Sequence, residues 1–322
     1  MRLPTLLQHF LLSLGLLTAH AGVFAQGAGT IRIITPFTTG TGYDTIARTV
    51  GNRLAEKLGT PVVVQNMPGA SGNIGTDAAA KAPADGNAIL MGGNTMLIAS
   101  QLYKNTPFHP LKDFAPVTLA ASGTLMLVAH PKVNVKSVAE LVQLSLAKPG
   151  AVNFGSPGVG TPHHMAMELF KVETKTFMLH VPYRGTAGYF QDLLGGELMT
   201  GFLPVHVAQN FVKTGKLVAL AVGSTQRHPV APDVPTFAEL GYRNIDVDLW
   251  YAFYVPAKTP APVVARLNTE ISAILREPAV RDVLNKGGMD AKSSTPEELM
   301  ALSQRDYQRW GLVIQAKNIS AD

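Results

Sequence analysis

The chain has 322 residues, of which 15% are charged, 30 are glycine and 22 are proline. This composition is typical of a compact α/β protein with many tight turns and excludes a disordered chain. The absence of cysteine excludes disulfides, thiolate metal sites and a cysteine nucleophile. A net charge of +5 favours anionic ligands weakly, and no basic run or array of arginine and aromatic residues indicates nucleic acid.

The first 25 residues have the pattern of a secretory signal peptide. They combine Arg2, a mostly apolar run over 6–17, and small residues that allow cleavage after Ala25 or, as the second choice, after Ala21. The apolar run is too short to span a bilayer. A later apolar stretch at 114–129 is interrupted by proline and polar residues and is predicted to form two short strands. We therefore expect a soluble, exported protein.

The remaining sequence alternates apolar strands with capped helices, which predicts a mostly parallel sheet covered by helices. In the first third, the predicted strands are 31–36, 62–66 and 88–92, and the predicted helices are 45–58 and a short one ending near 81. The central strands are predicted at 153–155, 178–181 and 218–222, and the central helices begin after Ser137 and Thr161 and cover 187–194. An aromatic strand at 250–255 precedes three helices that begin near 262, 278 and 295.

Two loops rich in glycine and threonine, TTGTGYD at 38–44 and GSPGVGTPH at 155–163, each follow an apolar strand and open a helix. A helix start carries N–H groups without intrahelical partners, and glycine lets a carboxylate approach them closely. The pair of loops therefore favours a clamp for a small carboxylate, and plain strand-to-helix turns are the alternative. The hydroxyl groups expected to add donors are those of Thr38, Thr39, Thr41, Ser156 and Thr161.

Several polar side chains near these loops have two interpretations. Asp44 is expected to be the N-cap of the first helix, with ligand contact as the lesser alternative. Arg184 either binds a second carboxylate or stays in solvent. His163 and His164 are adjacent and therefore point to different faces of a helix, which disfavours joint metal binding. The sequence predicts no metal site and no cofactor.

Eight segments of the chain resemble, in the same order, the substrate-binding proteins of tripartite tricarboxylate transporters, also called Bug receptors. They are PFTTGTGYDTIAR (36–48), VVVQNMPGASGNIG (62–75), FHPLKDFAPVTL (108–119), GSPGVGTPHH (155–164), HVPYRGTAG (180–188), LLGGEL (193–198), KTGKLVALAV (213–222) and VARLNTEI (264–271). The resemblance implies a type II periplasmic binding protein, a Venus flytrap in which two α/β domains are joined by two crossover strands. We expect domain 1 to comprise 26–124 and 226–322, and domain 2 to comprise 125–225.

The resemblance also implies how the ligand is held. In the family, one loop from each domain binds a ligand carboxylate mainly through main-chain amides and water, and the match carries this role to both loops of this chain. The ligand-binding residues expected from the resemblance and the sequence together are Thr38, Thr39, Gly40, Thr41, Gly42, Tyr43, Asp44, Ser156, Gly158, Gly160, Thr161, Tyr183 and Trp250.

Two positions depart from the family pattern and bear on the ligand. Tyr43 stands where threonine is usual, and Met199 stands where aspartate is frequent. Both replacements make the cleft more apolar, and together with Trp250 and Tyr251 they favour an aromatic or otherwise bulky carboxylate. Trp250 is equally well explained as a core residue, whereas Tyr43 is expected to face the cleft.

The resemblance predicts a monomeric periplasmic receptor that delivers a carboxylate to the membrane permease subunits of a transporter. A receptor that presents its ligand to a membrane sensor protein is one alternative, and a secreted hydrolase is a weaker one. GASGN at 69–73 and FGSPG at 154–158 do not satisfy the G-x-S-x-G motif, and GTGYDT at 40–45 lacks the third glycine of a dinucleotide fingerprint. We therefore expect a protein without catalytic activity.

Overall fold

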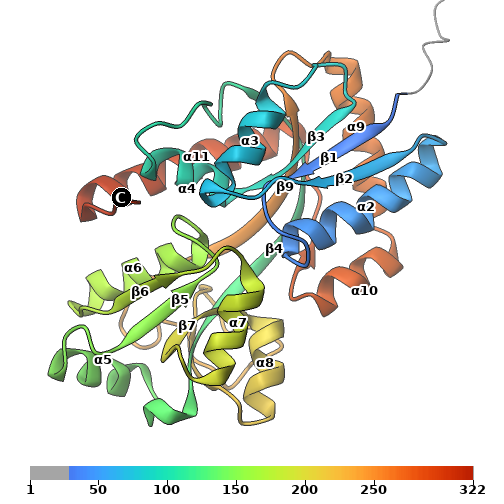
Figure 1. Ribbon diagram of the computed structural model, residues 1–322. Coiled ribbons are helices and arrows are strands. Elements are labelled where there is room, and N and C mark those ends of the chain that lie inside the picture. The colour runs from blue at the N-terminus through green and yellow to red at the C-terminus, as the bar shows by residue number, and fades with distance from the viewer. Residues whose placement is uncertain (1–28, 322) are drawn as a thin grey trace, which may run out of the picture.

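A computed structural model describes residues 29–321, and the expected signal peptide with its cleavage site lies outside this range. The described chain forms two α/β lobes that share one long strand, β4 (Phe114–Ala129), as Figure 1 shows. The hydrogen-bonded strands follow the order β2-β1-β3-β9-β4-β7-β5-β6, and β8 and β10 also pair with β4. None of the helices between residues 29 and 321 is long and apolar enough to cross a membrane.

The first lobe contains the beginning and the end of the range 29–321. Its strands are β1 (Ile31–Thr35), β2 (Val62–Asn66), β3 (Ala88–Gly93), β9 (Asp248–Pro256) and the two-residue β10 (Asp290–Ala291). Its helices are α2 (Gly42–Leu58), α3 (Asn73–Ala80), α4 (Asn94–Leu102), α9 (Ala261–Leu275), α10 (Pro278–Lys286) and α11 (Pro296–Lys317), with a 3-10 turn at Ala70–Gly72. Helix α2 forms because Ile46, Val50 and Leu54 recur every four residues, and all three are fully buried.

The second lobe is built from the middle of the chain. Its strands are β5 (Asn153–Ser156), β6 (Leu179–Pro182), β7 (Thr200–Pro204) and β8 (Val218–Val222). Its helices are α5 (Val138–Ala147), α6 (Pro162–Thr174), α7 (Thr186–Gly195) and α8 (Val205–Lys213), with a 3-10 turn at Pro131–Val133. Strands β1, β2 and β3 are parallel, as are β5, β6 and β7, whereas β9, β8 and β10 all run antiparallel to β4. The sheet is therefore less parallel than the alternation of elements predicted.

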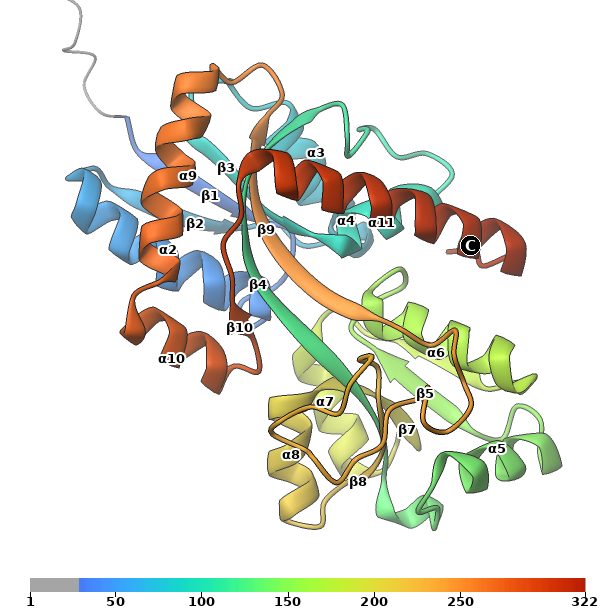
Figure 2. The same cartoon turned by 180° about the vertical axis from the view of Figure 1, so that it is seen from behind.

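Strand β4 joins the lobes, and the prediction of two short strands at 114–129 was wrong. It pairs with β9 as far as Thr124 and with β7 from Leu125 onward, so its partners change in the middle of one continuous strand. The strand continues through the proline and polar residues that interrupt its apolar sequence. The register of its pairing with β9 shifts between Pro116 and Thr118. The buried Thr118 hydroxyl donates a hydrogen bond to the Ser294 carbonyl at 3.0 Å. Figure 2 shows β4 and β9 running side by side between the lobes.

We propose that the second connection between the lobes lies later in the chain than the expected boundary at 225/226. Segment 226–247 packs on the second lobe, where the Phe237 ring lies 6.1 Å from Phe170 and 5.9 Å from Phe202. The chain then enters β9 of the first lobe at Asp248. The expected boundary at 124/125 coincides with the change of partners along β4. For the other boundary, we propose 247/248 in place of 225/226.

Candidate functional site

A cavity of about 550 Å³ lies between the two lobes. We call it the interlobe cavity. Its wall in the first lobe consists of Phe37, Thr38, 68–72 and Tyr103, and its wall in the second lobe consists of 157–159 and 182–184. Its size is within the range of small-molecule binding sites. Since both lobes line it, a ligand of sufficient size can contact both.

The charge of this lining is positive. Among the described residues that line the interlobe cavity, Arg184 is the only one with a charged side chain. The lining also contains the aromatic residues Phe37, Tyr103 and Tyr183. The Tyr183 hydroxyl is oriented by a hydrogen bond of 2.5 Å to the Asp192 carboxylate. An organic anion with an apolar body is the ligand that such a lining favours.

A smaller void of about 40 Å³ shares Phe37 and Pro157 with the interlobe cavity. Four helix starts meet there: residues 41–43 at α2, Thr95 at α4, 161–163 at α6, and 185–186 at α7. Each helix start carries a partial positive charge from its aligned peptide dipoles. Their convergence from two lobes makes this smaller void attractive to an anion.

The two glycine-rich loops are built in the same way, although they belong to different lobes. In the first loop, Gly40 has a φ of 83° and donates its N–H to the Asp44 carboxylate at 3.0 Å. In the second loop, Gly160 has a φ of 78° and donates its N–H to His164 Nδ1 at 3.2 Å. Both glycines thus open a helix in the left-handed conformation that glycine adopts without strain.

The threonine of each loop repeats the same pattern. Thr41 donates its hydroxyl to the Thr38 carbonyl at 2.9 Å and accepts the Asp44 N–H, and this makes it the N-cap of α2. Thr161 donates to the Gly158 carbonyl at 2.8 Å and accepts the His164 N–H, which makes it the N-cap of α6. These hydroxyls are used within their own loops, so the expectation that they add donors for a ligand lacks support.

Asp44 is the third residue of α2 and not its N-cap, so our expectation was wrong. The helix begins three residues earlier than predicted, and Asp44 closes the loop from within its first turn. Burial opposes ionisation, but hydrogen bonds from Arg48, Gly40 and Asn66 outweigh it and lower the pKa of Asp44. The charged Asp44 carboxylate therefore holds the loop and is not free to contact a ligand.

Histidines hold the second loop. Ser156 is fully buried, and its hydroxyl lies 2.7 Å from His180 Nε2. The His180 ring stacks on His164 with their centroids 4.2 Å apart. Burial, reinforced by His164, lowers the pKa of His180 to about 3. Since Ser156 has no exposed surface, it positions the loop and is not available as a hydrolase nucleophile.

The structure divides the expected ligand-binding residues into four groups. Thr38, Gly158 and Tyr183 line the interlobe cavity. Thr41, Gly42, Tyr43 and Thr161 line the smaller void. Gly40, Asp44, Ser156 and Gly160 form bonds that shape the loops, and Thr39 is exposed beside them. Trp250 lies away from both spaces.

Of the apolar residues expected to favour a bulky carboxylate, none lines the interlobe cavity. Trp250 is a core residue because its ring is 3% exposed and its indole N–H donates to the Asp306 carboxylate at 2.7 Å. Met199 packs against the core and lines neither space. Tyr43 does not line the interlobe cavity, and its hydroxyl donates to Thr95 at 3.1 Å beside the smaller void. The aromatic wall of the interlobe cavity is supplied by other residues, Phe37 and Tyr103 among them.

Sequence reasoning missed the segment 68–72 as part of the site. Its residues Gly69, Ala70, Ser71 and Gly72 have consecutive positive φ angles of 135°, 46°, 51° and 93°. Positive φ costs a non-glycine residue of order 1–3 kcal/mol, and such conformations cluster at ligand sites. The Ser71 hydroxyl lies 3.1 Å from the Tyr103 hydroxyl, another residue that was missed. The two glycines of this segment predict a turn from the sequence. That the turn faces the second lobe could not be predicted from the sequence.

Residues 46–319 match the family described as "Tripartite tricarboxylate transporter family receptor". The chain belongs to this family. The resemblance noted from the sequence is therefore confirmed, and the family consists of substrate-binding receptors and not of enzymes. The expected α/β periplasmic binding protein fold is confirmed by solved structures that include the periplasmic binding protein BugD, which is 28% identical, has a TM-score of 0.83 and covers 90% of this chain and 98% of that one.

Three similar proteins show how much of the chain is covered by the similarity. BugT of Bordetella pertussis is 33% identical over 310 residues, which are 94% of this chain and 95% of BugT. The structure of Rpa4515 from Rhodopseudomonas palustris with adipate is 28% identical, has a TM-score of 0.85 and covers 92% of this chain and 99% of that one. The structure of MatC from the same organism with bound malate is 29% identical, has a TM-score of 0.83 and covers 89% of this chain and 99% of that one.

Proposed function

We propose that this receptor captures a small organic carboxylate in the interlobe cavity, in the periplasm, and delivers it as a monomer to the permease subunits of a tripartite tricarboxylate-type transporter. The observation that carries the proposal is the convergence of four helix starts from two lobes beside a cavity whose only charged lining residue, within 29–321, is Arg184. The adipate and malate held by two relatives support a carboxylate as the ligand class. The signal-like leader supports export.

The lining also favours a ligand with two features. Its charged group interacts with Arg184 or with the helix starts, where main-chain N–H groups offer donors to an anion. Its body contacts Phe37, Tyr103 and Tyr183, which do not compete for the charge. A carboxylate with at least a few carbon atoms in its body satisfies both, and it gains more from this lining than a compact inorganic anion does.

Capture by such a receptor requires the lobes to close on the ligand. The lobes approach each other closely across the site in this structure, because a Cβ atom built on Gly158 of the second lobe would lie 3.5 Å from Ser71 Oγ of the first. A ligand that touches both walls stabilises this arrangement by its differential affinity for it. Closure of the two lobes then presents the permease with a surface that the open receptor lacks.

A carboxylate screen with a matched pair of variants tests the proposal. Val159 lies in the second loop and lines the interlobe cavity. Val159→Asp puts a negative charge into the site, whereas Val159→Asn has nearly the same shape without the charge. The screen uses thermal shift with adipate, malate, citrate and benzoate on the exported protein, because a specific ligand raises the melting temperature.

We expect at least one carboxylate to bind the wild type and Val159→Asn, and to bind Val159→Asp about 5- to 150-fold more weakly. The reason is that two unit charges about 6 Å apart repel by roughly 1–3 kcal/mol at effective dielectric constants between those of water and a protein surface. Isothermal titration calorimetry measures the affinities. Equal affinity of the two variants for the carboxylate would contradict its binding beside the second loop, and binding of none of the acids would contradict the ligand class.

A further inference from the structure

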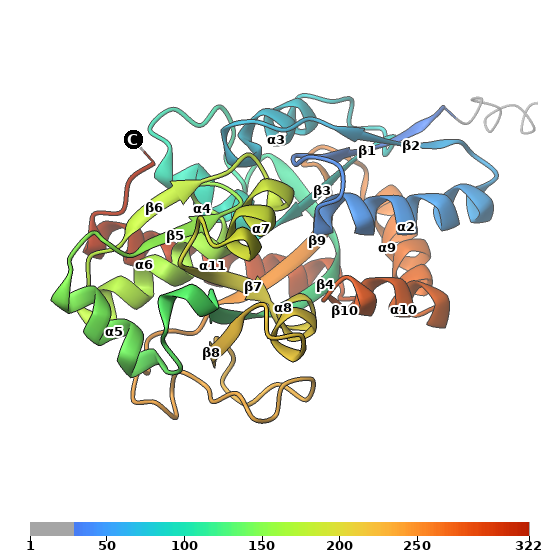
Figure 3. The ribbon, with the colours of Figure 1, turned by 60° about the horizontal axis from the view of Figure 1, so that its bottom comes forward.

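Two histidines of the second lobe face a carboxylate of the first lobe on the side where α8 approaches β10. His206 lies in the first turn of α8, His228 follows β8 in the segment 226–247, and Asp290 lies in β10. Figure 3 shows α8 beside α10 and β10, although these elements belong to different lobes. The backbones are close here, since a Cβ atom built on Gly288 would lie 3.4 Å from the His206 Cβ.

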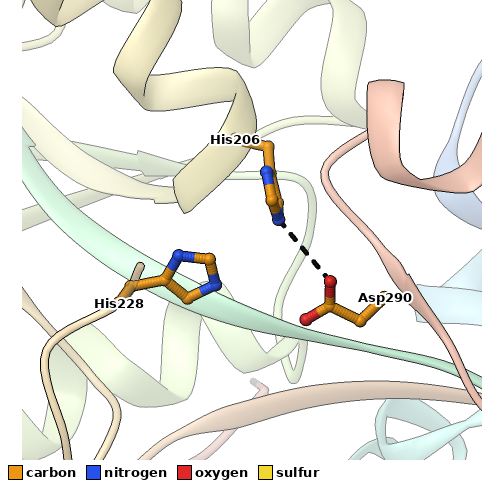
Figure 4. A group of neighbouring side chains, drawn as sticks. All are labelled: His206, His228 and Asp290. Carbon is orange, nitrogen blue, oxygen red and sulfur yellow. Dashed lines mark ion pairs between the residues drawn. The ribbon is translucent and has the colours of Figure 1, made fainter. Parts of the chain in front are cut away.

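The three side chains point toward one another, as Figure 4 shows. One ligand atom from each of them lies within 4.8 Å of the others. His206 Nε2 is 3.8 Å from an Asp290 carboxylate oxygen, and the two imidazole rings are 5.0 Å apart at an angle of 88°. Tetrahedral ligands that are each about 2.0–2.1 Å from Zn²⁺ lie about 3.3 Å apart, so side-chain movements of about 1.5 Å or less complete the set.

His206 has an unused ring nitrogen in this cluster. Its Nε2 atom is buried and has no hydrogen-bond partner among the described residues, and the 3.8 Å to Asp290 is too long for a hydrogen bond. A buried polar atom without a partner costs free energy. A cation placed between the three groups would remove this cost by accepting the lone pair of Nε2.

We propose that His206, His228 and Asp290 bind one borderline transition-metal ion, with Zn²⁺ as the reference ion, and that this ion bridges the two lobes. Two imidazoles and one carboxylate are a ligand set typical of Zn²⁺ and its first-row neighbours, and unlike the all-oxygen sets of Ca²⁺ and Mg²⁺. All three side chains are partly exposed, so an ion reaches them from solvent. The site is separate from the interlobe cavity, whose lining includes none of the three.

The bridge would act on how the lobes sit relative to each other. The residue before Asp290, Met289, packs under the first loop, since a Cβ atom built on Gly42 would lie 3.0 Å from Met289 Sδ. An ion bound by both lobes stabilises the arrangement in which its ligands meet. This places a metal-dependent link between strand β4, which joins the lobes and pairs with β10, and the start of α2.

The experiment uses the exported protein purified without a histidine tag, treated with EDTA and titrated with ZnCl₂ by isothermal titration calorimetry. We expect one Zn²⁺ per chain and a rise in melting temperature on binding. His206→Gln, His228→Gln and Asp290→Asn should each weaken Zn²⁺ binding at least about tenfold, because even second-shell losses cost that much. The control variants are His109→Gln and Asp282→Asn, which remove a histidine or a carboxylate elsewhere in the first lobe and should leave the affinity unchanged.

Each possible outcome decides the proposal. The absence of stoichiometric binding, or binding that none of the three substitutions weakens, would overturn the site. Loss of affinity in both histidine variants with an unchanged affinity in Asp290→Asn would overturn the bridge. Absorption spectroscopy with Co²⁺ in place of Zn²⁺ tests the site without any variant. We expect visible absorption typical of a nitrogen-bound Co²⁺ ion of low coordination number. A spectrum equal to that of the aqueous ion would refute the site.

Discussion

Gly185 offers the sharpest test of how the lobes close. It is the N-cap of α7 in the second lobe and faces Thr38 of the first. A Cβ atom built on Gly185 would lie 2.7 Å from Thr38 Oγ1, whereas ordinary van der Waals contacts begin at 3.4 Å. Gly185→Ala therefore pushes the lobes apart by about 0.7 Å, the difference between these distances, unless one of the two residues moves.

The size of the effect follows from this misfit. Forcing an extra methyl group into a packed contact costs about 1–3 kcal/mol, which corresponds to a 5- to 150-fold loss of ligand affinity if the contact forms only in the closed state. Gly185 also has a φ of 130°, so alanine is strained there whether the lobes are open or closed. That strain lowers the stability of the variant, but it does not depend on Thr38.

A double-mutant cycle separates the two contributions. The affinities of wild type, Gly185→Ala, Thr38→Ala and the double variant are measured by calorimetry with the tightest carboxylate of the screen. Because Thr38→Ala removes the oxygen that the new methyl group meets, we expect the double variant to regain most of the affinity lost in Gly185→Ala. If Gly185→Ala costs as much affinity in the Thr38→Ala background as in the wild type, the interlobe contact is not what limits closure.

Two further predictions concern stability. Trp250→Phe should destabilise the protein by about 1–3 kcal/mol in urea unfolding, because the buried Asp306 carboxylate loses a hydrogen-bond donor at 2.7 Å. The affinity for the ligand should not change. A changed affinity would contradict the assignment of Trp250 to the core. Burial alone would raise the pKa of Glu168, but hydrogen bonds from His164 and Lys171 lower it from 4.5 to about 2. The stability that Glu168 contributes is therefore present above pH 4.5 and is lost as the pH falls toward 2, by up to about 3 kcal/mol. Glu168→Gln should flatten the pH dependence of unfolding in this window, and an unchanged pH profile would contradict the assignment.

The sequence predicted the elements whose signals are local. The four-residue spacing in α2, the strands β1, β2 and β8, and the Thr295 cap of α11 all depend on neighbours a few residues away. Helix α4 escaped prediction because seven of its nine residues are buried, which leaves it without an exposed polar face to mark its period. Strand β4 was divided in two because its polar residues find partners, such as Ser294 for Thr118, that lie far away in the sequence.

In the candidate site, too, local features could be predicted from the sequence and long-range contacts could not. From the sequence alone it follows that two loops of similar composition each open a helix, because glycine, threonine and an apolar strand are local signals. Only the tertiary structure decided that both threonine hydroxyls are used within their loops, that Arg184 lies beside the aromatic wall, and that Trp250 belongs to the core. The physical reason is that hydrogen-bond partners and cavity walls come from segments brought together by the lobes, and a contact between distant segments leaves no periodic trace in either of them.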